Sequence, residues 1–215
     1  MYKVGLTGNY YSGQVEVSQI FEGFDVPVFN ANLIVKFLIN FSSPHIRKIK
    51  DTLGESSYRV GLLDLQKINN NKSFDKIFDI IEIDLFRAYE KFRLKHKDEF
   101  YTIFYFDHIF ERNLKDRFDF IVSCYRPEHH RKYDMQYLTN LSDFTIQKIL
   151  DNEMNPSFKN NSSDYIIQNY NTNGDYRSDI VIGLESQVKK VHKRIMSKKL
   201  ESTIMNHYGL DLKDQ

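Results

Sequence analysis

Short continuous apolar runs alternate along this chain with longer segments in which apolar residues recur every three or four positions. The short runs lie at residues 2–6, 26–29, 101–106, 118–124 and 164–169. The runs at 101–106 and 118–124 are rich in β-branched and aromatic residues, which is typical of inner strands in a parallel sheet covered on both faces. We therefore predict a strand at each of the five runs.

The periodic segments between these runs predict helices, and the clearest is residues 73–97, whose apolar side chains form one stripe that faces the core. Pro44 stands in the first turn of the helix expected at 43–54, where proline is favoured. The other helices are expected at residues 14–21, 31–40, 128–138, 142–154 and 178–206.

Strands that alternate with helices predict an α/β fold with a doubly wound parallel sheet. We expect a single domain over residues 1–200, with a helical insert at about 44–98 and a lid at about 126–160. A long C-terminal helix closes the domain, and residues 201–215 form a tail. A chain of 215 residues is long enough to bury a substantial core.

Composition narrows the cellular setting more than the function. The 30 basic and 29 acidic residues nearly cancel to a net charge of +1, so no global field draws the chain to nucleic acid or to an anionic membrane. Cys124 is the single cysteine, which excludes an internal disulfide and a multi-cysteine zinc site and suits a reducing compartment. Lys36 interrupts the apolar run at 33–39, so we expect no membrane span and a cytoplasmic location.

The loop after the first predicted strand has the outline of a phosphate-binding loop. Gly8 and Gly13 keep the required spacing at a junction between strand and helix. Such a loop surrounds phosphate with backbone N–H groups, while a lysine contacts the outer phosphates and a hydroxyl holds Mg²⁺. Here Gln14 and Val15 stand at those two positions. The candidate nucleotide-binding residues are Gly8, Asn9, Tyr10, Tyr11, Ser12, Gly13, Gln14 and Val15.

Four phrases carry a resemblance to a known family: GLTGNYYSGQV at 5–15, VFNAN at 28–32, IFE at 109–111, and Met154 with Lys159 and SDYIIQN at 163–169. They resemble, over nearly the whole chain, the dephospho-CoA kinase family, whose members phosphorylate the ribose 3′-hydroxyl of dephospho-coenzyme A with ATP and Mg²⁺. The resemblance implies a P-loop NTPase-like fold, with Asn30, Asn32 and Glu111 on the substrate side of the site.

The chain departs from the family pattern at the positions that carry chemistry. Gln14 replaces the phosphate lysine, and Val15 replaces the hydroxyl that holds Mg²⁺. Asn30 and Asn32 replace two carboxylates, one of which is the expected base in the family, and an amide has almost no basicity near neutral pH. Further departures are Leu138 for an arginine, Glu153 for a glutamine, and Ile83 with Asp84 for a His-Pro pair.

Other charged residues offer replacement chemistry. Asp107, at the end of a predicted strand, is a candidate metal ligand or a cap for the next turn. Asp107 and Lys159 are the catalytic candidates if the protein is active, whereas a solvated surface position is the default expectation for Asp25, Glu111 and Lys159. His129 and His130 do not share a helix face and have no third ligand nearby, so zinc is not favoured.

Basic side chains gather in two helices. A first basic group lies at the start of the expected helix 128–138 and consists of Arg126, Arg131 and Lys132. These residues either meet an anion or are lid-surface charges. The last helix places Val188, Val191 and Ile195 at helical spacing, which predicts one packed side and one charged side. The charged side is either solvated or meets an acidic protein or nucleic acid. Its basic residues are Lys189, Lys190, His192, Lys193, Arg194, Lys198 and Lys199.

Together these patterns favour a catalytically degenerate relative of dephospho-CoA kinase that serves as a binding or structural component. The alternatives are an active ATP-dependent kinase with an altered site, for which ATP and Mg²⁺ are required, and a nucleic-acid-associated protein that uses the last helix. The leading hypothesis requires no cofactor or metal and expects a protein partner, with a nucleotide or coenzyme-A-like molecule as a candidate ligand. It favours neither nucleic acid nor membrane. The composition also fits a component of a viral particle.

Overall fold

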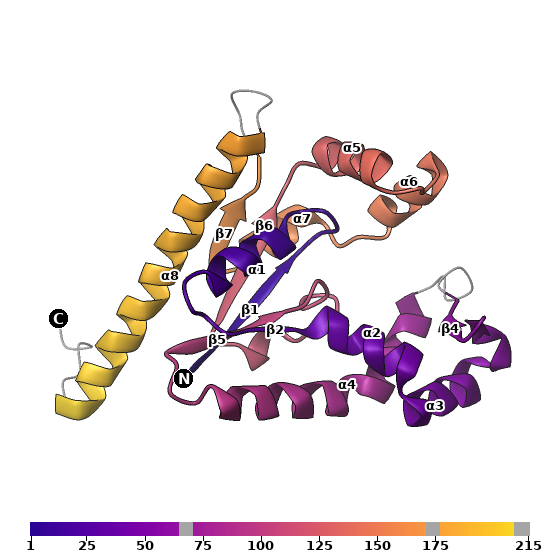
Figure 1. Cartoon of the computed structure of the whole chain (residues 1–215), viewed down its shortest axis with the longest axis horizontal. Helices are drawn as coiled ribbons and strands as arrows, with labels where there is room; N and C mark the ends of the chain where they lie inside the picture. The colour runs from indigo at the N-terminus through magenta and orange to yellow at the C-terminus, as the bar shows by residue number, and fades with distance from the viewer. Residues whose placement is uncertain (65–70, 171–176, 209–215) are drawn as a thin grey trace. The chain divides into compact units, whose positions relative to one another are not determined.

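The computed structural model describes residues 1–64, 71–170 and 177–208. The chain divides into two compact units, one formed by residues 1–28 with 98–215 and the other by residues 29–97. Each unit is described by itself below, and Figure 1 shows the course of the chain through both.

The central sheet has five strands in the order β2, β5, β1, β6, β7. The strands are β1 (Tyr2–Gly8), β2 (Val28–Asn30), β5 (Tyr101–Tyr105), β6 (Phe120–Tyr125) and β7 (Tyr165–Gln168). Neighbours β1 and β5, β1 and β6, and β6 and β7 pair in parallel, with Val4 opposite both Ile103 and Phe120. All five predicted strands are confirmed, and every residue of β5 is buried, as expected for an inner strand.

Helices of the first unit are α1 (Gln14–Glu22), α5 (Glu128–Leu138), α6 (Asp143–Asp151), α7 (Pro156–Asn161) and α8 (Arg177–Tyr208). Val17 and Phe21 of α1 pack with Val188 of α8 against the buried side chains of β1, β5, β6 and β7. Figure 1 shows α8 as a long, straight helix running beside β7 and α1. A one-turn helix, η2 (Lys115–Arg117), precedes β6. The sequence did not predict the short helix α7.

The predicted two-sided character of α8 is confirmed. Leu184, Val188, Val191 and Ile195 are buried, whereas the side chains of the basic stripe are on the exposed side. That stripe consists of the exposed residues Lys189, Lys190, Lys193, Arg194 and Lys198, whereas His192 and Lys199 of the predicted cluster are half-buried. Whether this stripe is solvated or meets an acidic protein or nucleic acid stays a prediction.

The second unit is helical with a small hairpin. Its helices are α2 (Ala31–Phe41), α3 (Ser43–Leu53), η1 (Glu55–Ser57) and α4 (Asn71–Lys95), and its strands are β3 (Tyr58–Arg59) and β4 (Leu62–Leu63). Ile49, Leu63 and Ile77 form one cluster of its buried apolar side chains. His45 is buried between the Ser42 hydroxyl, 2.7 Å from Nδ1, and the Asp84 carboxylate, 3.1 Å from Nε2.

The three long predicted helices of this unit are confirmed, with ends that shift by two residues or fewer. The β3–β4 hairpin was not predicted, because two-residue strands are too short to leave a periodic pattern. Within the described residues, no helix combines the length and the apolar character needed to cross a bilayer.

Candidate phosphate-loop site

The glycine-rich segment forms a tight loop between β1 and α1. Gly13 has φ 93° and ends the loop at the first turn of α1. The first bond of the helix runs from the Val17 N–H to the Gly13 carbonyl, so the N–H groups of residues 14–16 precede it and have no acceptor within the helix. Gly8 lies so close to β6 that a Cβ there would be 2.7 Å from the Cys124 carbonyl oxygen. The backbone therefore keeps the geometry of a phosphate-binding loop.

Gln14 lies inside this loop and bonds to it. Gln14 is only 4% exposed. Its side-chain amide nitrogen donates to the Asn9 carbonyl at 2.9 Å and to Asp107 Oδ1 at 3.2 Å. The neutral amide thus bonds to the backbone of the loop and to Asp107, which follows β5. Val15, at the next position, is 51% exposed and has no oxygen in its side chain.

Glu153 and Arg131 form a buried ion pair against residues 9 and 10 of the loop. Glu153 Oε1 accepts the Tyr10 N–H at 2.7 Å, and Oε2 accepts from Asn9 Nδ2 at 3.0 Å. Arg131, 1% exposed, donates through NH1 to Glu153 Oε2 at 2.7 Å and to the Tyr10 carbonyl at 3.0 Å. Of the two roles considered for Arg131, a lid-surface charge is wrong, and the anion that it meets is the Glu153 carboxylate.

Lys159 is buried beneath the loop, which corrects the expectation of a solvated position. It is 2% exposed, and its ammonium group donates to the carbonyl oxygens of Gly8 and Asp107, both at 3.1 Å. Glu111 Oε1 completes the set at 2.7 Å. An ammonium group has three donors, so these three acceptors account for all of them.

A histidine that the sequence reasoning did not select lies beside Tyr10. His108 Nε2 is 3.4 Å from the Tyr10 hydroxyl, and the two rings meet edge to face. Burial lowers the pKa of His108 to about 4, against the opposing effect of Glu111, so the imidazole is neutral near pH 7. Burial and the nearby carboxylates of Asp107 and Glu153 raise the pKa of Tyr10 to about 12.

The lowered pKa of His108 gives a prediction for stability against pH. The unfolded chain binds this proton below pH 6.5, whereas the folded chain binds it only below about pH 4. Acid therefore favours the unfolded state over this window, by about 1–3 kcal/mol from this group. We expect His108→Gln to flatten the fall in the free energy of unfolding, measured in urea, between pH 7 and pH 4.5. His129→Gln, at an exposed position of α5, is the control. An unchanged slope in His108→Gln would contradict the lowered pKa of His108.

The remaining sequence candidates divide between the two units. Asp107, Glu111, Lys159 and residues 8–15 come together in the first unit, whereas Asn30 and Asn32 belong to the second from residue 29 onward. Asn30 caps α2, because its Oδ1 accepts the Leu33 N–H at 3.2 Å.

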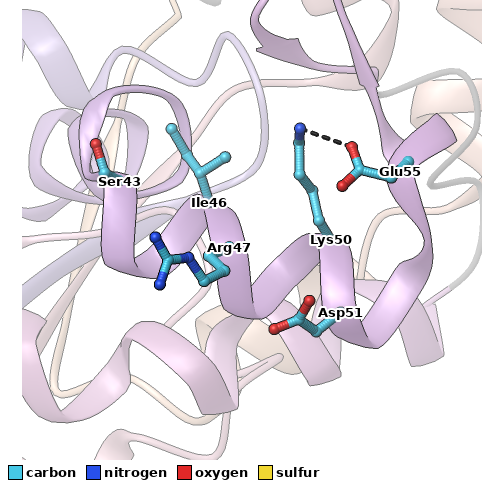
Figure 2. A pocket seen from close by; sticks show the side chains of 6 residues that line it. All are labelled: Ser43, Ile46, Arg47, Lys50, Asp51 and Glu55. Atoms are coloured by element: carbon cyan, nitrogen blue, oxygen red, sulfur yellow. Dashed lines mark ion pairs between the residues drawn. The ribbon is translucent and has the colours of Figure 1, made fainter.

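A pocket of about 270 Å³ lies in the second unit along α3 (Figure 2). It is lined by Ser43, Ile46, Arg47, Lys50, Asp51 and Glu55. Figure 2 shows the Lys50 ammonium turned toward the Glu55 carboxylate, with which it forms an ion pair at 2.7 Å. None of the residues selected from the sequence lines this pocket.

A parallel sheet with flanking helices and a glycine loop at the β1–α1 junction defines the class of P-loop kinase-like proteins. Solved structures with this fold include TT1252 from Thermus thermophilus, with a TM-score of 0.73 at 13% identity, covering 90% of this chain and 96% of that one. A shikimate kinase from Acinetobacter baumannii in complex with shikimate has a TM-score of 0.52 at 13% identity over 93% and 96% of the two chains. At these identities the likeness concerns the fold alone.

The sequence profile of the dephospho-CoA kinase family matches residues 2–175, and the chain belongs to that family. A dephospho-CoA kinase from Bdellovibrio bacteriovorus is 25% identical over 179 residues, which cover 77% of this chain and 86% of the relative. The structure of a dephospho-CoA kinase from Campylobacter jejuni has a TM-score of 0.51 at 13% identity, over 90% of this chain and 97% of that one. The resemblance read from the four sequence phrases is thereby confirmed.

Proposed function

We propose that this protein is a non-catalytic member of the dephospho-CoA kinase family that serves as a binding or structural component of an assembly. The observation that carries the proposal is Gln14, which takes the place of the phosphate lysine and donates to Asn9 and Asp107. Phosphoryl transfer depends on positioning and on positive charge around the migrating group. Losing one such donor costs about 3–4 kcal/mol of barrier, or roughly a thousandfold in rate.

The residues present do not fit the Mg²⁺ ion that the family requires. Val15, at the position of the family's hydroxyl ligand, is 51% exposed and offers no ligand atom. The Asp107 carboxylate, the candidate replacement, accepts the Gln14 amide at 3.2 Å. The amides Asn30 and Asn32 also lack the basicity expected at the family's carboxylate positions.

Lys159 does not compensate for the missing lysine. It keeps a positive charge below the loop, but its three donors are directed at the Gly8 carbonyl, the Asp107 carbonyl and the Glu111 carboxylate. Contact with a phosphate would require breaking at least one of these buried bonds. This arrangement argues against the alternative of an active kinase that uses Asp107 and Lys159.

We expect the purified protein to form coenzyme A from dephospho-coenzyme A, ATP and Mg²⁺ at a rate at least about a thousandfold below that of an active relative. The dephospho-CoA kinase from Bdellovibrio bacteriovorus, assayed beside it by chromatography of the product, is the positive control. A thermal-shift series with ATP, dephospho-coenzyme A and coenzyme A, each with and without Mg²⁺, tests binding separately from turnover. Coenzyme A formation at a rate comparable with the relative would refute the proposal.

A further inference from the structure

We infer that the loop of this protein already holds an anion supplied by the chain itself, the carboxylate of Glu153, and that this carboxylate keeps small phosphate-type anions out. The inference rests on the proposed non-catalytic function, because a working kinase needs its loop accessible to the phosphates of ATP.

The contacts of Glu153 are those that a bound oxyanion would make. Oε1 accepts a backbone N–H of the loop, from Tyr10 at 2.7 Å, and Oε2 accepts the Asn9 amide at 3.0 Å. The guanidinium of Arg131 donates to both oxygens, at 2.9 and 2.7 Å. Backbone N–H groups and arginine are the usual donors to phosphate in proteins. The carboxylate therefore takes the Tyr10 N–H, the Asn9 amide and Arg131, which would otherwise be available to a phosphate at the loop, whereas the N–H groups of residues 14–16 are not among its donors.

The chain holds this carboxylate in place from both sides. Glu153 lies in the segment between α6 and α7, where the next residue, Met154, accepts a second bond from Asn9 Nδ2 at 2.9 Å. The side chain of Glu153 is 7% exposed and that of Arg131 is 1% exposed, so water screens the pair weakly. Among the residues that the structure describes, none accepts a hydrogen bond from the buried Arg131 Nε.

The charges around the loop also disfavour a second anion. Among the side chains that bond to one another at the loop, the three carboxylates of Asp107, Glu111 and Glu153 stand against the two cations Arg131 and Lys159. The same carboxylates contribute to raising the pKa of the Tyr10 hydroxyl beside them. Removing the charge of Glu153 would balance the cluster and leave Arg131 without its anion.

The test is Glu153→Gln, with Asp151→Asn as the matched control. Both substitutions remove one negative charge, but Asp151 is exposed on α6 and contacts Gln147, not the loop. The probe is inorganic pyrophosphate without Mg²⁺, followed by calorimetry. We expect no saturable binding to the unmodified protein or to Asp151→Asn at millimolar pyrophosphate, and at least about tenfold tighter binding to Glu153→Gln. A folded Glu153→Gln protein that binds no tighter than the control overturns the inference.

A second measurement uses the unmodified protein and does not depend on the variant folding. Amide hydrogen exchange followed by NMR should show the Tyr10 N–H protected, and adding pyrophosphate should leave its signal unchanged. Exchange at the rate of an open loop, or a saturable shift of this signal with pyrophosphate, overturns the inference. Neither readout measures turnover, so an inactive protein with an open loop would refute only this inference, whereas coenzyme A formation would refute the proposed function.

Discussion

Arg131→Met lowers the free energy of unfolding by about 3–5 kcal/mol, because it leaves the Glu153 carboxylate buried without its cation. Methionine preserves much of the arginine's apolar volume, so the loss is mainly electrostatic. The double variant Arg131→Met with Glu153→Gln should recover a large part of the loss, since neither partner of the pair then leaves an unpaired buried charge. Urea unfolding of the unmodified protein, the two single variants and the double variant gives a double-mutant cycle, which measures the interaction energy between Arg131 and Glu153.

Arg87→Met is the control for this result. Arg87 pairs with Asp84 on α4, where the two side chains are 62% and 41% exposed, and exposed pairs contribute about 1 kcal/mol or less. An Arg131→Met variant that loses no more stability than Arg87→Met would show that the buried pair does not hold the lid segment to the loop. The same conclusion would follow if the double variant were no more stable than Arg131→Met.

Gly13→Ala is the second change with a large expected effect, a loss of about 2–5 kcal/mol. Gly13 has φ 93°, where an L-residue costs about 1–2 kcal/mol, and an added Cβ would lie 2.0 Å from Asn169 Nδ2, where overpacking costs about 1–3 kcal/mol more. Asn169 cannot simply turn away, because this nitrogen donates to the Ser12 carbonyl at 3.1 Å. The measurement is again the free energy of unfolding in urea.

Two further variants separate the backbone cost from the clash. Gly61→Ala, at φ 78° with nothing within 4 Å of the added Cβ, should show the backbone cost alone. The Asn169→Ala substitution leaves only the Cβ of residue 169, which lies 3.4 Å from the Cβ added at Gly13. In this background the cost of Gly13→Ala should therefore fall toward that of Gly61→Ala. If the cost stays unchanged in that background, the contact between Gly13 and Asn169 is not its cause.

Much of the fold was predictable because local pattern determines it. The continuous apolar runs at 101–106 and 118–124 became β5 and β6, and the segment 128–138 became α5 with the same ends. Inner strands of a parallel sheet leave continuous apolar runs and amphipathic helices leave a period of 3.6 residues, so both can be recognised from the local sequence. The elements that were missed, α7 and the β3–β4 hairpin, are too short to show either period.

The sequence predicted the positions of the loop and also selected Asp107, Glu111 and Lys159, but not the contacts that these residues make. Gly8, Gly13, Gln14 and Val15 were selected because a phosphate loop has fixed spacing. Arg131 was left between an anion contact and a lid-surface charge, Lys159 was a catalytic candidate with a solvated position as the default, and His108 was not selected, since a charged or titratable residue is usually solvated. Their burial depends on partners distant in the sequence, such as Glu153, 22 residues from Arg131, and Gly8, 151 residues from Lys159.

The sequence by itself determined the order of strands and helices, the family, and the absence of the phosphate lysine and of the hydroxyl beside it. Only the tertiary structure decided what takes their place: the Gln14 amide bonded within the loop, Lys159 bonded beneath it, and the Glu153 carboxylate held against it by Arg131. The physical reason is that a residue type fixes charge and hydrogen-bonding capacity, whereas the fold fixes which partner satisfies them.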